Sequence, residues 1–340
     1  MTTPLIERYR ARLPVSEITP VISLGEGSTP LIRAPRLSER YGAGVWLKWD
    51  AANPTGSYKD RGMTVAVSKA VEEGAHAVVV ASTGNTASSA AAYAAKAGIG
   101  ALILQPVGAV ASGKVAQTRM YGAMVLDVRG SFDEALACAR VLAARGTYAL
   151  VNSVNPYRRE GQKTAVFEIV EELGATPDAI YLPYGGGGNT TAYGQAFAEL
   201  GSTPSRLIAA EARDRPHTVA SAIRIAEPAH EETVVAALEA TRGAVVTLED
   251  AAILAAWADL ARAEGLFCEP SSAAGLAALD VERPEPGSTV VCVITGHGLK
   301  DPATAAAHAP APVEVDPDPD AIAALSLRES AYGFSRGESK

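Results

Sequence analysis

Short runs of β-branched residues alternate with Ala-rich helical segments along most of this 340-residue chain, and this alternation constrains the fold more than any other feature. Strands separated by helices of this length are typical of an α/β protein with mostly parallel sheets. Right-handed crossovers would place a ligand site at the carboxyl ends of the strands. We predict strands at 45–49, 77–81, 101–105, 124–128, 148–151, 179–183, 206–210 and 289–294, and helices at 60–73, 85–97, 131–145, 160–173, 190–200 and 248–264.

Length and composition narrow the class of protein. The length suggests about two domains, and 48% hydrophobic with 20% charged residues excludes disorder of the whole chain. The 30 basic and 38 acidic residues leave a net charge of −8, which argues against a nucleic-acid or anionic-membrane partner. Cys138, Cys268 and Cys292 are far apart, so we expect neither a disulfide framework nor a metal site. With no apolar secretory segment at the N-terminus, we expect a cytoplasmic protein.

A lysine inside a loop of small residues marks the first candidate site. The segment 53–63, NPTGSYKDRGM, places Lys59 at the predicted start of a helix. A free lysine amine has a pKa of about 10.4, so roughly one in a thousand is neutral near pH 7.4. A nucleophilic amine therefore needs burial and a cationic neighbourhood, and a helix N-terminus supplies a positive dipole end. The alternative is an ordinary surface lysine at a helix start.

Two further strand-to-helix turns predict anion sites. The segment 81–90, ASTGNTASSA, holds more polar residues than one N-cap needs and indicates a cradle for a carboxylate, although plain capping is equally open. The second turn has four glycines, Gly185 to Gly188, followed by Asn189. Such a loop lets the backbone close around a phosphate group. It is neither a Walker A loop nor a dinucleotide fingerprint in context, and a flexible loop is the alternative.

Two more segments carry polar residues just after strands. The segment 152–163, NSVNPYRREGQK, suits a phosphorylated or doubly anionic substrate, and a solvated helix start is equally open. The segment 293–301, VITGHGLKD, brings Thr295 to the end of a buried strand, where its hydroxyl would contact a bound ring. We assign His297, between two glycines, a structural role and no catalysis.

Together these segments resemble the threonine synthase family, which consists of pyridoxal 5′-phosphate enzymes of the tryptophan synthase β-like fold, or fold type II. NPYRREGQKT and TGHGLKDP are more specific to this family than to its dehydratase relatives. The resemblance extends over residues 25–302, almost the whole chain. It is carried by GEGSTPL (25–31), NPTGSYKDRGM (53–63), ASTGNTASSAAAYAAKAG (81–98), NSVNPYRREGQKT (152–164), TVASAIRI (218–225), EPSSAAGLAAL (269–279) and VITGHGLKDP (293–302).

The resemblance implies a role for each candidate residue. Lys59 would be the catalytic lysine that forms a Schiff base with pyridoxal 5′-phosphate, Asn85 would bond the phenolic oxygen of the cofactor, and Thr295 would contact its pyridine nitrogen. The implied reaction is γ-elimination of phosphate from O-phospho-L-homoserine, followed by β-hydration to threonine. The remaining implied contacts are Gly185, Gly186, Gly187, Gly188 and Asn189 for the cofactor phosphate; Ser82, Thr83 and Thr86 for the substrate carboxylate; and Asn152, Ser153 and Arg158 for the substrate phosphate.

The resemblance also implies an architecture of two α/β domains with the cofactor between them, and a homodimer. We expect a smaller domain at 45–151, a larger one formed by 1–44 and 152–310, and a linker and tail at 311–340 with one short helix at 321–327.

The chain departs from the family pattern at two places. Its loop is all glycine before Asn189, where the family often has another Asn. Residues 226–228 read Ala-Glu-Pro, where the family commonly has Gly-Asn-Pro. If that second loop helps to close the site, the Glu227 carboxylate would disfavour a dianionic substrate.

Three other functions compete with this interpretation. A threonine or serine dehydratase, or a β- or γ-replacement enzyme of the same class, would need no phosphate subsite. A cofactor-free anion-binding protein would not need Lys59. A nicotinamide dehydrogenase is the weakest alternative, because no dinucleotide fingerprint stands in context.

Overall fold

The computed structural model describes residues 3–108, 113–320 and 322–323, and the chain divides into two compact units. The first unit ends at Pro302 and holds both β-sheets, whereas the second begins at Ala303 and carries most of α12 (Pro302–His308). Residues 311–320, where we expect the linker, are exposed, and the helix and tail expected beyond them fall almost entirely outside the described residues. Within the described ranges no helix is long and apolar enough to cross a membrane.

The larger sheet has six strands in the order β1-β2-β10-β7-β8-β9. Only β1 runs antiparallel to its neighbour, and the other pairs are parallel. Every residue of β7 is buried, as expected for a central strand covered on both faces. The strands are β1 (Leu31–Arg33), β2 (Gly44–Trp49), β7 (Ala179–Pro183), β8 (Arg206–Ala212), β9 (Ala244–Leu248) and β10 (Thr289–Ile294).

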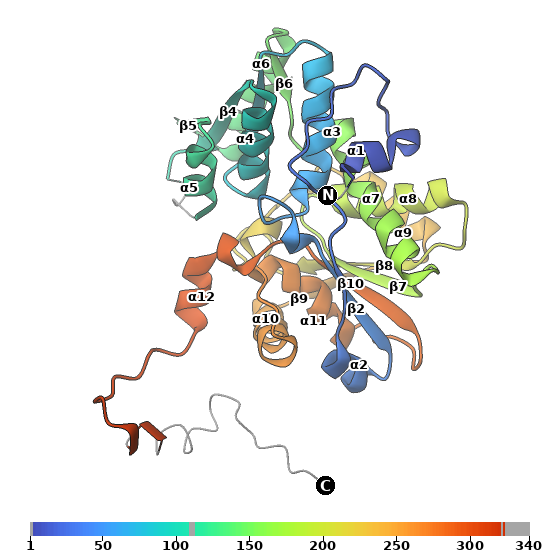
Figure 1. The fold of residues 1–340 in the computed structure, drawn as a ribbon, viewed down its shortest axis with the longest axis vertical. Helices are drawn as coiled ribbons and strands as arrows, with labels where there is room; N and C mark the ends of the chain where they lie inside the picture. The colour runs from blue at the N-terminus through green and yellow to red at the C-terminus, as the bar shows by residue number, and fades with distance from the viewer. Residues whose placement is uncertain (1–2, 109–112, 321, 324–340) are drawn as a thin grey trace. The chain divides into compact units, whose positions relative to one another are not determined.

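The smaller sheet has four parallel strands in the order β5-β4-β3-β6 and lies at the top of the view in Figure 1. Alternate residues of β3 pack into different cores, Val78 and Val80 into one and Val79 and Ala81 into the other. This period of two is what a strand buried on both faces requires. The strands are β3 (Ala77–Ala81), β4 (Gly100–Pro106), β5 (Met124–Val128) and β6 (Tyr148–Leu150).

Helices cover both sheets and complete the cores. Residues of α3, α4 and one face of the smaller sheet share one core, and residues of α6 pack on its other face. Residues of α7, α8 and α9 build the core of the larger sheet, and α11 contacts β7 and β8. The helices of the first unit are α1 (Leu5–Arg8), α2 (Pro35–Tyr41), α3 (Lys59–Glu72), α4 (Asn85–Ala97), α5 (Gly113–Met120), α6 (Phe132–Ala144), α7 (Pro156–Leu173), α8 (Gly188–Leu200), α9 (Glu231–Ala240), α10 (Asp250–Glu264) and α11 (Ala274–Ala277).

Helices α3 and α7 cross with their backbones in contact, and glycine makes this crossing possible. A Cβ on Gly161 would lie 1.9 Å from the carbonyl oxygen of Arg61, and one on Gly62 would lie 2.4 Å from that of Arg158. Since α3 also packs into the core of the smaller sheet, it connects the two layers. The crossing brings Arg158 next to the first turn of α3.

The structure confirms the predicted α/β class. All eight predicted strands are present, and the six predicted helices correspond to α3, α4, α6, α7, α8 and α10. Strands β1 and β9 and helices α1, α2, α5, α9, α11 and α12 were not predicted. The division into domains stays a prediction: all of β2 except Gly44 falls inside the range 45–151, yet β2 pairs with β1 and β10 of the larger sheet.

Candidate active site

The predicted site residues lie on the loops that follow the carboxyl ends of parallel strands, or in the first turns of the helices after them, where α/β sheets bind ligands. The loop after β2 and the end of β10 are joined by backbone bonds. The Tyr58 N–H donates to the Thr295 carbonyl at 2.9 Å, and Ser57 forms a β-bridge with Gly296. Lys59 and Thr295, 236 positions apart in sequence, are therefore held next to each other.

Lys59 is the first residue of α3, and its side chain is half-buried. Its Nζ donates to the Tyr58 hydroxyl at 2.6 Å and lies 4.4 Å from the centroid of the Tyr58 ring. No ion pair joins Lys59 to a carboxylate among the residues that the structure describes. The amine therefore stands at a positive helix end with an aromatic hydroxyl as its neighbour. The sequence analysis missed Tyr58, although it directly precedes Lys59.

A buried acid and a buried amine fix the loop that carries Lys59. Asp60 accepts from the backbone and hydroxyl of Thr55, both at 2.7 Å, and from Ser89 Oγ at 2.6 Å. Burial raises the pKa of Asp60 to about 6, and these hydrogen bonds limit the rise. Lys300 Nζ donates to the Thr55 carbonyl and to Ser88 Oγ, both at 3.0 Å, and burial lowers the pKa of Lys300 to about 8.

A second cluster gathers around Asn85, the first residue of α4. Asn85 Nδ2 donates to Glu269 Oε1 at 2.7 Å, and Glu269 forms a buried ion pair with Lys114 at 2.9 Å. Ser272 Oγ lies 2.9 Å from Thr295 Oγ1. An amide nitrogen carries two hydrogens, so Asn85 keeps one for a ligand. Its Oδ1 is buried without a hydrogen-bond partner among the described residues, which indicates a missing polar neighbour.

The glycine-rich loop leads directly into α8, which begins at Gly188. Gly187 has φ of 86°, and a Cβ there would lie 2.6 Å from Val234 Cγ2, so the backbone needs glycine. No side chain caps the helix at this residue. Asn189 Nδ2 and Thr190 Oγ1 are also buried, with no partner in the described part of the chain. Free donors at a helix N-terminus suit a phosphate group.

Arg158 is almost fully buried but only partly satisfied. Its Nη1 donates to the Val151 carbonyl at 2.8 Å, while Nε and Nη2 are buried and find no partner among the described residues. Burial lowers the pKa of Arg158 to about 10, and the nearby Tyr58 and Asp60 only partly oppose this. A guanidinium held in this way favours an anion, which would accept from both free nitrogens.

The other predicted substrate-binding residues differ from one another in hydrogen bonding and in exposure. Asn152 uses its carboxamide on the backbone of Ala81, accepting at 3.0 Å and donating at 2.9 Å, and so ties β3 to the loop after β6. Ser82 Oγ accepts from the Gly84 N–H at 3.2 Å, Thr83 is exposed, and Thr86 is half-buried. Their contacts with a substrate stay predictions.

One cavity of about 330 Å³ opens beside the loop that carries Lys59. None of the predicted site residues lines this cavity, so the assignment of the active site does not depend on it. The lining residues are Pro54, Thr55, Gly56, Gly113, Gln117, His297, Leu299 and Lys300.

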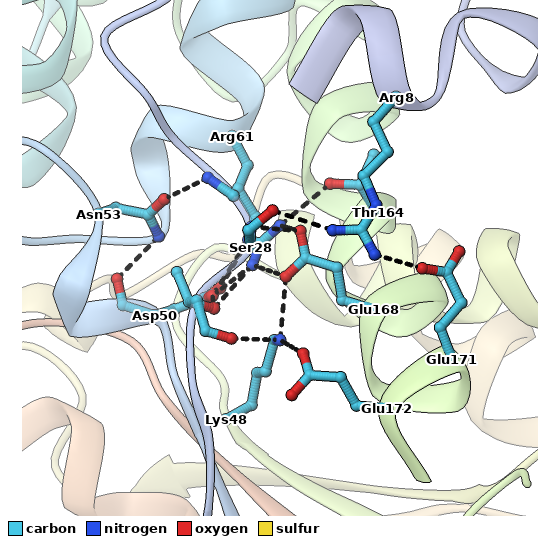
Figure 2. Close-up of polar contacts among 12 residues, drawn as sticks. Arg8, Ser28, Lys48, Asp50, Asn53, Arg61, Thr164, Glu168, Glu171 and Glu172 are labelled. Atoms are coloured by element: carbon cyan, nitrogen blue, oxygen red, sulfur yellow. Dashed lines mark hydrogen bonds and ion pairs between the residues drawn. The ribbon is translucent and has the colours of Figure 1, made fainter. Parts of the chain in front are cut away.

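A buried ionic network supports α3 two residues after Lys59 (Figure 2). Arg61 pairs with Asp50 at 2.8 Å and with Glu168 at 2.6 Å, and Lys48 pairs with Glu168 at 2.9 Å. All four side chains are at most 1% exposed. The Ser28 N–H donates to Glu168 at 2.8 Å. The network connects α3 to the end of β2 and to α7, so it fixes the start of the Lys59 helix.

The network gives a pH prediction for stability. Burial alone would raise the pKa of Glu168, but the charges of Arg61 and Lys48 outweigh it and hold this pKa at about 2, below its ordinary value of 4.5. The folded state therefore binds this proton more weakly than the unfolded state does. Its contribution to stability is present above pH 4.5 and is lost as the pH falls toward 2. We expect the free energy of unfolding in urea to fall less steeply below pH 4.5 in Glu168→Gln than in the wild type; equal slopes would contradict this.

The fold and this set of side chains fit an α/β enzyme that would bind a phosphorylated ligand next to a lysine. The chain belongs to the pyridoxal-phosphate dependent enzymes, because the model of that family matches residues 22–296. It is 47% identical to the threonine synthase of Synechocystis sp. over 88% of this chain and 84% of that protein. It is 48% identical to that of Mycobacterium leprae over 88% of this chain and 89% of that protein.

Solved structures agree with this assignment at the level of the fold. Maize serine racemase superimposes with a TM-score of 0.74 at 23% identity, covering 86% of this chain and 92% of the other. Isoform 2 of the threonine deaminase of Solanum lycopersicum, in its processed form, superimposes with a TM-score of 0.72 at 21% identity, covering 87% of this chain and 85% of the other.

The residues present fit pyridoxal phosphate. Lys59 would carry the cofactor, and the glycine loop with Asn189 offers unpartnered donors for its phosphate. The Asn85 amide, at the start of α4, and the Thr295 hydroxyl, after β10, would contact its ring. The sequence analysis found each of these segments but missed the roles of Glu269 and Lys114. Glu269 belongs to the EPSSAAG segment, which is one of the segments that carry the family resemblance. The residues around Lys114 form no motif that would mark it as part of a site.

Proposed function

We propose that this chain is a threonine synthase that converts O-phospho-L-homoserine and water to L-threonine and phosphate. Curated relatives at 44% to 48% identity over 88% of the chain carry that name. Within the structure, the observation that carries the proposal is Arg158: a buried guanidinium with two nitrogens that find no partner among the described residues, next to the Lys59 helix. A dehydratase would have no phosphate group to place there.

Each residue of the site has a task in this reaction. The free N–H groups at the start of α8 and the Asn189 amide would hold the cofactor phosphate, and the Thr295 hydroxyl would contact the pyridine nitrogen. Pyridoxal phosphate, when bound, supplies the electron sink that stabilises negative charge at the substrate α-carbon. Lys59 accepts the α-proton, and the polar turn of Ser82, Thr83 and Thr86 binds the substrate carboxylate.

The end of the substrate that carries phosphate lies on the side of Arg158. Arg158 binds the phosphate group through its two free nitrogens, with Ser153 and Asn152 beside it. A fixed guanidinium orients the bond to the γ-carbon for cleavage, because bidentate contacts are directional. Once phosphate has left, water adds at the β-carbon, and this hydration separates a threonine synthase from a simple eliminating enzyme.

Single-substrate turnover tests the proposal. Purified protein, supplemented with pyridoxal phosphate, is given O-phospho-L-homoserine, and both the released phosphate and the amino-acid product are identified. Equal amounts of phosphate and threonine are expected. Phosphate with 2-oxobutyrate would indicate elimination without hydration, and turnover of serine or threonine with no action on the phosphorylated substrate would favour the dehydratase.

A conservative change at Arg158 tests its assignment. Arg158→Lys keeps a positive charge but loses the second donor, so we expect kcat/KM for O-phospho-L-homoserine to fall about 10- to 100-fold, the value of one charged hydrogen bond. The visible absorption of the bound cofactor and the cofactor affinity should stay as in the wild type. An equal loss of turnover and of cofactor binding would show that Arg158 acts on the cofactor or on the fold instead.

The proposal also includes a cytoplasmic location and a homodimer. Both rest on the cysteine usage and on the family resemblance. Light scattering of the purified protein in solution tests the dimer directly.

A further inference from the structure

Glu269 lies between the two residues that are predicted to contact the cofactor ring, although neither the motifs nor the comparisons give it a role. Its backbone N–H donates to the Gly296 carbonyl at 3.0 Å, directly after Thr295. A Cβ on Gly296 would collide with Glu269 Oε1, so the carboxylate packs on the backbone just after β10. The same oxygen accepts from Asn85 Nδ2 at 2.7 Å. Glu269 therefore joins the loop of Thr295 to the first turn of α4.

The counter-charge of this buried carboxylate comes from α5. Lys114 Nζ lies 2.9 Å from Glu269 Oε2, and both side chains are buried. Oε2 accepts no hydrogen bond among the described residues, and the Lys114 amine donates instead to Ser221 Oγ at 3.3 Å. The Lys114–Glu269 contact is therefore an ion pair in which Lys114 supplies charge. Without Lys114, the carboxylate would stay buried with no cation in contact, which is costly.

The other titratable groups near Glu269 do not replace Lys114. Lys300, in the short turn after β10, also acts on Glu269 through its charge, but its amine donates to Ser88 Oγ and to a backbone carbonyl. Cys268 precedes Glu269, and burial raises the pKa of its thiol, so this neighbour stays neutral. Lys114 is thus the cation in ion-pair contact with Glu269 in the described part of the chain.

An ionised Glu269 determines how the Asn85 amide is turned. A carboxylate only accepts hydrogen bonds, so Asn85 has to offer Nδ2 and not Oδ1. A protonated carboxyl group would donate to Oδ1 instead and let the amide turn over. Each amide nitrogen carries two hydrogens, so the observed orientation leaves one N–H of Asn85 for a ligand.

We propose that Lys114 and Glu269 are positioning residues of the cofactor site. The Lys114 charge keeps Glu269 ionised, and Glu269 holds the Asn85 amide so that its second N–H is left for the phenolic oxygen of pyridoxal phosphate. The inference rests on the cofactor contact of Asn85 in the proposed function. It adds two residues that act on the cofactor through Asn85 and do not touch it themselves.

The first test measures cofactor affinity, by titrating pyridoxal phosphate into the full-length protein. We expect the Kd to rise about 10- to 100-fold in Lys114→Met, the value of one hydrogen bond to a charged group. Lys114→Arg keeps the positive charge and should stay close to the wild type. Lys96→Met removes an exposed lysine of α4 and should leave the Kd unchanged.

A double variant separates charge from packing. Glu269→Gln makes the side chain neutral, so it needs no counter-charge, and its amide oxygen can still accept from Asn85. Lys114→Met combined with Glu269→Gln should therefore recover most of the affinity that Lys114→Met loses. A double variant that binds the cofactor as weakly as Lys114→Met, or more weakly, would overturn the inference.

The absorption of the holoenzyme gives a readout that a merely structural role would not move. An N–H donated to the phenolic oxygen stabilises negative charge there and so favours release of its proton. Loss of this contact should move the pH dependence of the visible absorption upward by about one pH unit in Lys114→Met, the equivalent of a tenfold change. The double variant should move it back. A pH profile of Lys114→Met that superimposes on that of the wild type would contradict the proposal.

Asn85→Ala separates this inference from the contact on which it rests. If Asn85→Ala binds pyridoxal phosphate as tightly as the wild type, the cofactor contact of Asn85 fails, and the inference fails with it. If Asn85→Ala weakens binding and Lys114→Met does not, the contact stands and the role of Lys114 is wrong. Neither result depends on which amino acid the enzyme converts, so turnover of O-phospho-L-homoserine remains a separate test.

Discussion

Replacement of Lys59 with alanine is expected to lower kcat for O-phospho-L-homoserine by about 10⁴-fold, the upper end of what one acid–base group contributes. Lys59 stands at the N-terminus of α3 and has no carboxylate partner among the described residues, so its amine is available both to carry the cofactor and to accept the α-proton. The alanine variant should also lose the visible absorption that a lysine-bound cofactor gives. Phosphate and threonine release, measured with added pyridoxal phosphate, checks the loss of activity.

The structure provides a matched control for this change. Lys96 is exposed and lies near the C-terminal end of α4, the opposite end from Asn85, so Lys96→Ala should keep full activity. Lys59→Ala should keep its fold, because the loop is held by Asp60 and Lys300 rather than by the Lys59 amine. A Lys59→Ala protein that retained more than about 1% of wild-type kcat would refute the assigned role.

The strands were predictable because their sequences are short, β-branched and flanked by turn residues. Every residue of β7, with the sequence AIYLP, is buried, so the hydrophobic run and the structure coincide. The missed strands lack that signal. β1 has three residues and pairs only at the edge of the sheet, and β9 alternates exposed and buried positions at the opposite edge. Edge strands depend on their neighbour for pairing, and a single sequence does not show that neighbour.

The candidate site was predictable where its local backbone geometry depends on residues that are adjacent in the sequence. Four consecutive glycines, or a lysine that opens a helix, can be recognised in the sequence because the local geometry depends on those residues. The tertiary partners were not predictable. Lys114 reaches Glu269, 155 positions away, and His230 reaches Ser153, 77 positions away. These contacts depend on how the two sheets and α7 pack, which local patterns do not specify.

Replacement of Arg61 with methionine is expected to lower the free energy of unfolding by about 3–5 kcal/mol, the cost of breaking a buried ion pair from one side. Arg61 is fully buried and pairs with both Asp50 and Glu168. Lys48 still compensates Glu168 in the variant, but Asp50 keeps only the Thr29 hydroxyl, at 2.8 Å, as a side-chain partner among the described residues. The Asp50 carboxylate would therefore remain buried without a counter-charge. Urea unfolding of the variant and the wild type at pH 7 measures the difference.

Two further variants decide whether the buried charge is the cause. Arg213→Met breaks the ion pair between Arg213 and Glu249, two side chains that are each 64% exposed. It should change the free energy of unfolding by less than about 1 kcal/mol. Adding Asp50→Asn to Arg61→Met removes the stranded charge and should recover part of the lost stability, because the cost lies in an uncompensated carboxylate rather than in the missing guanidinium. If the double variant is as unstable as the sum of its single variants, the loss comes from packing at the α3–α7 crossing. The network would then stabilise the start of α3 through side-chain packing and not through its charges.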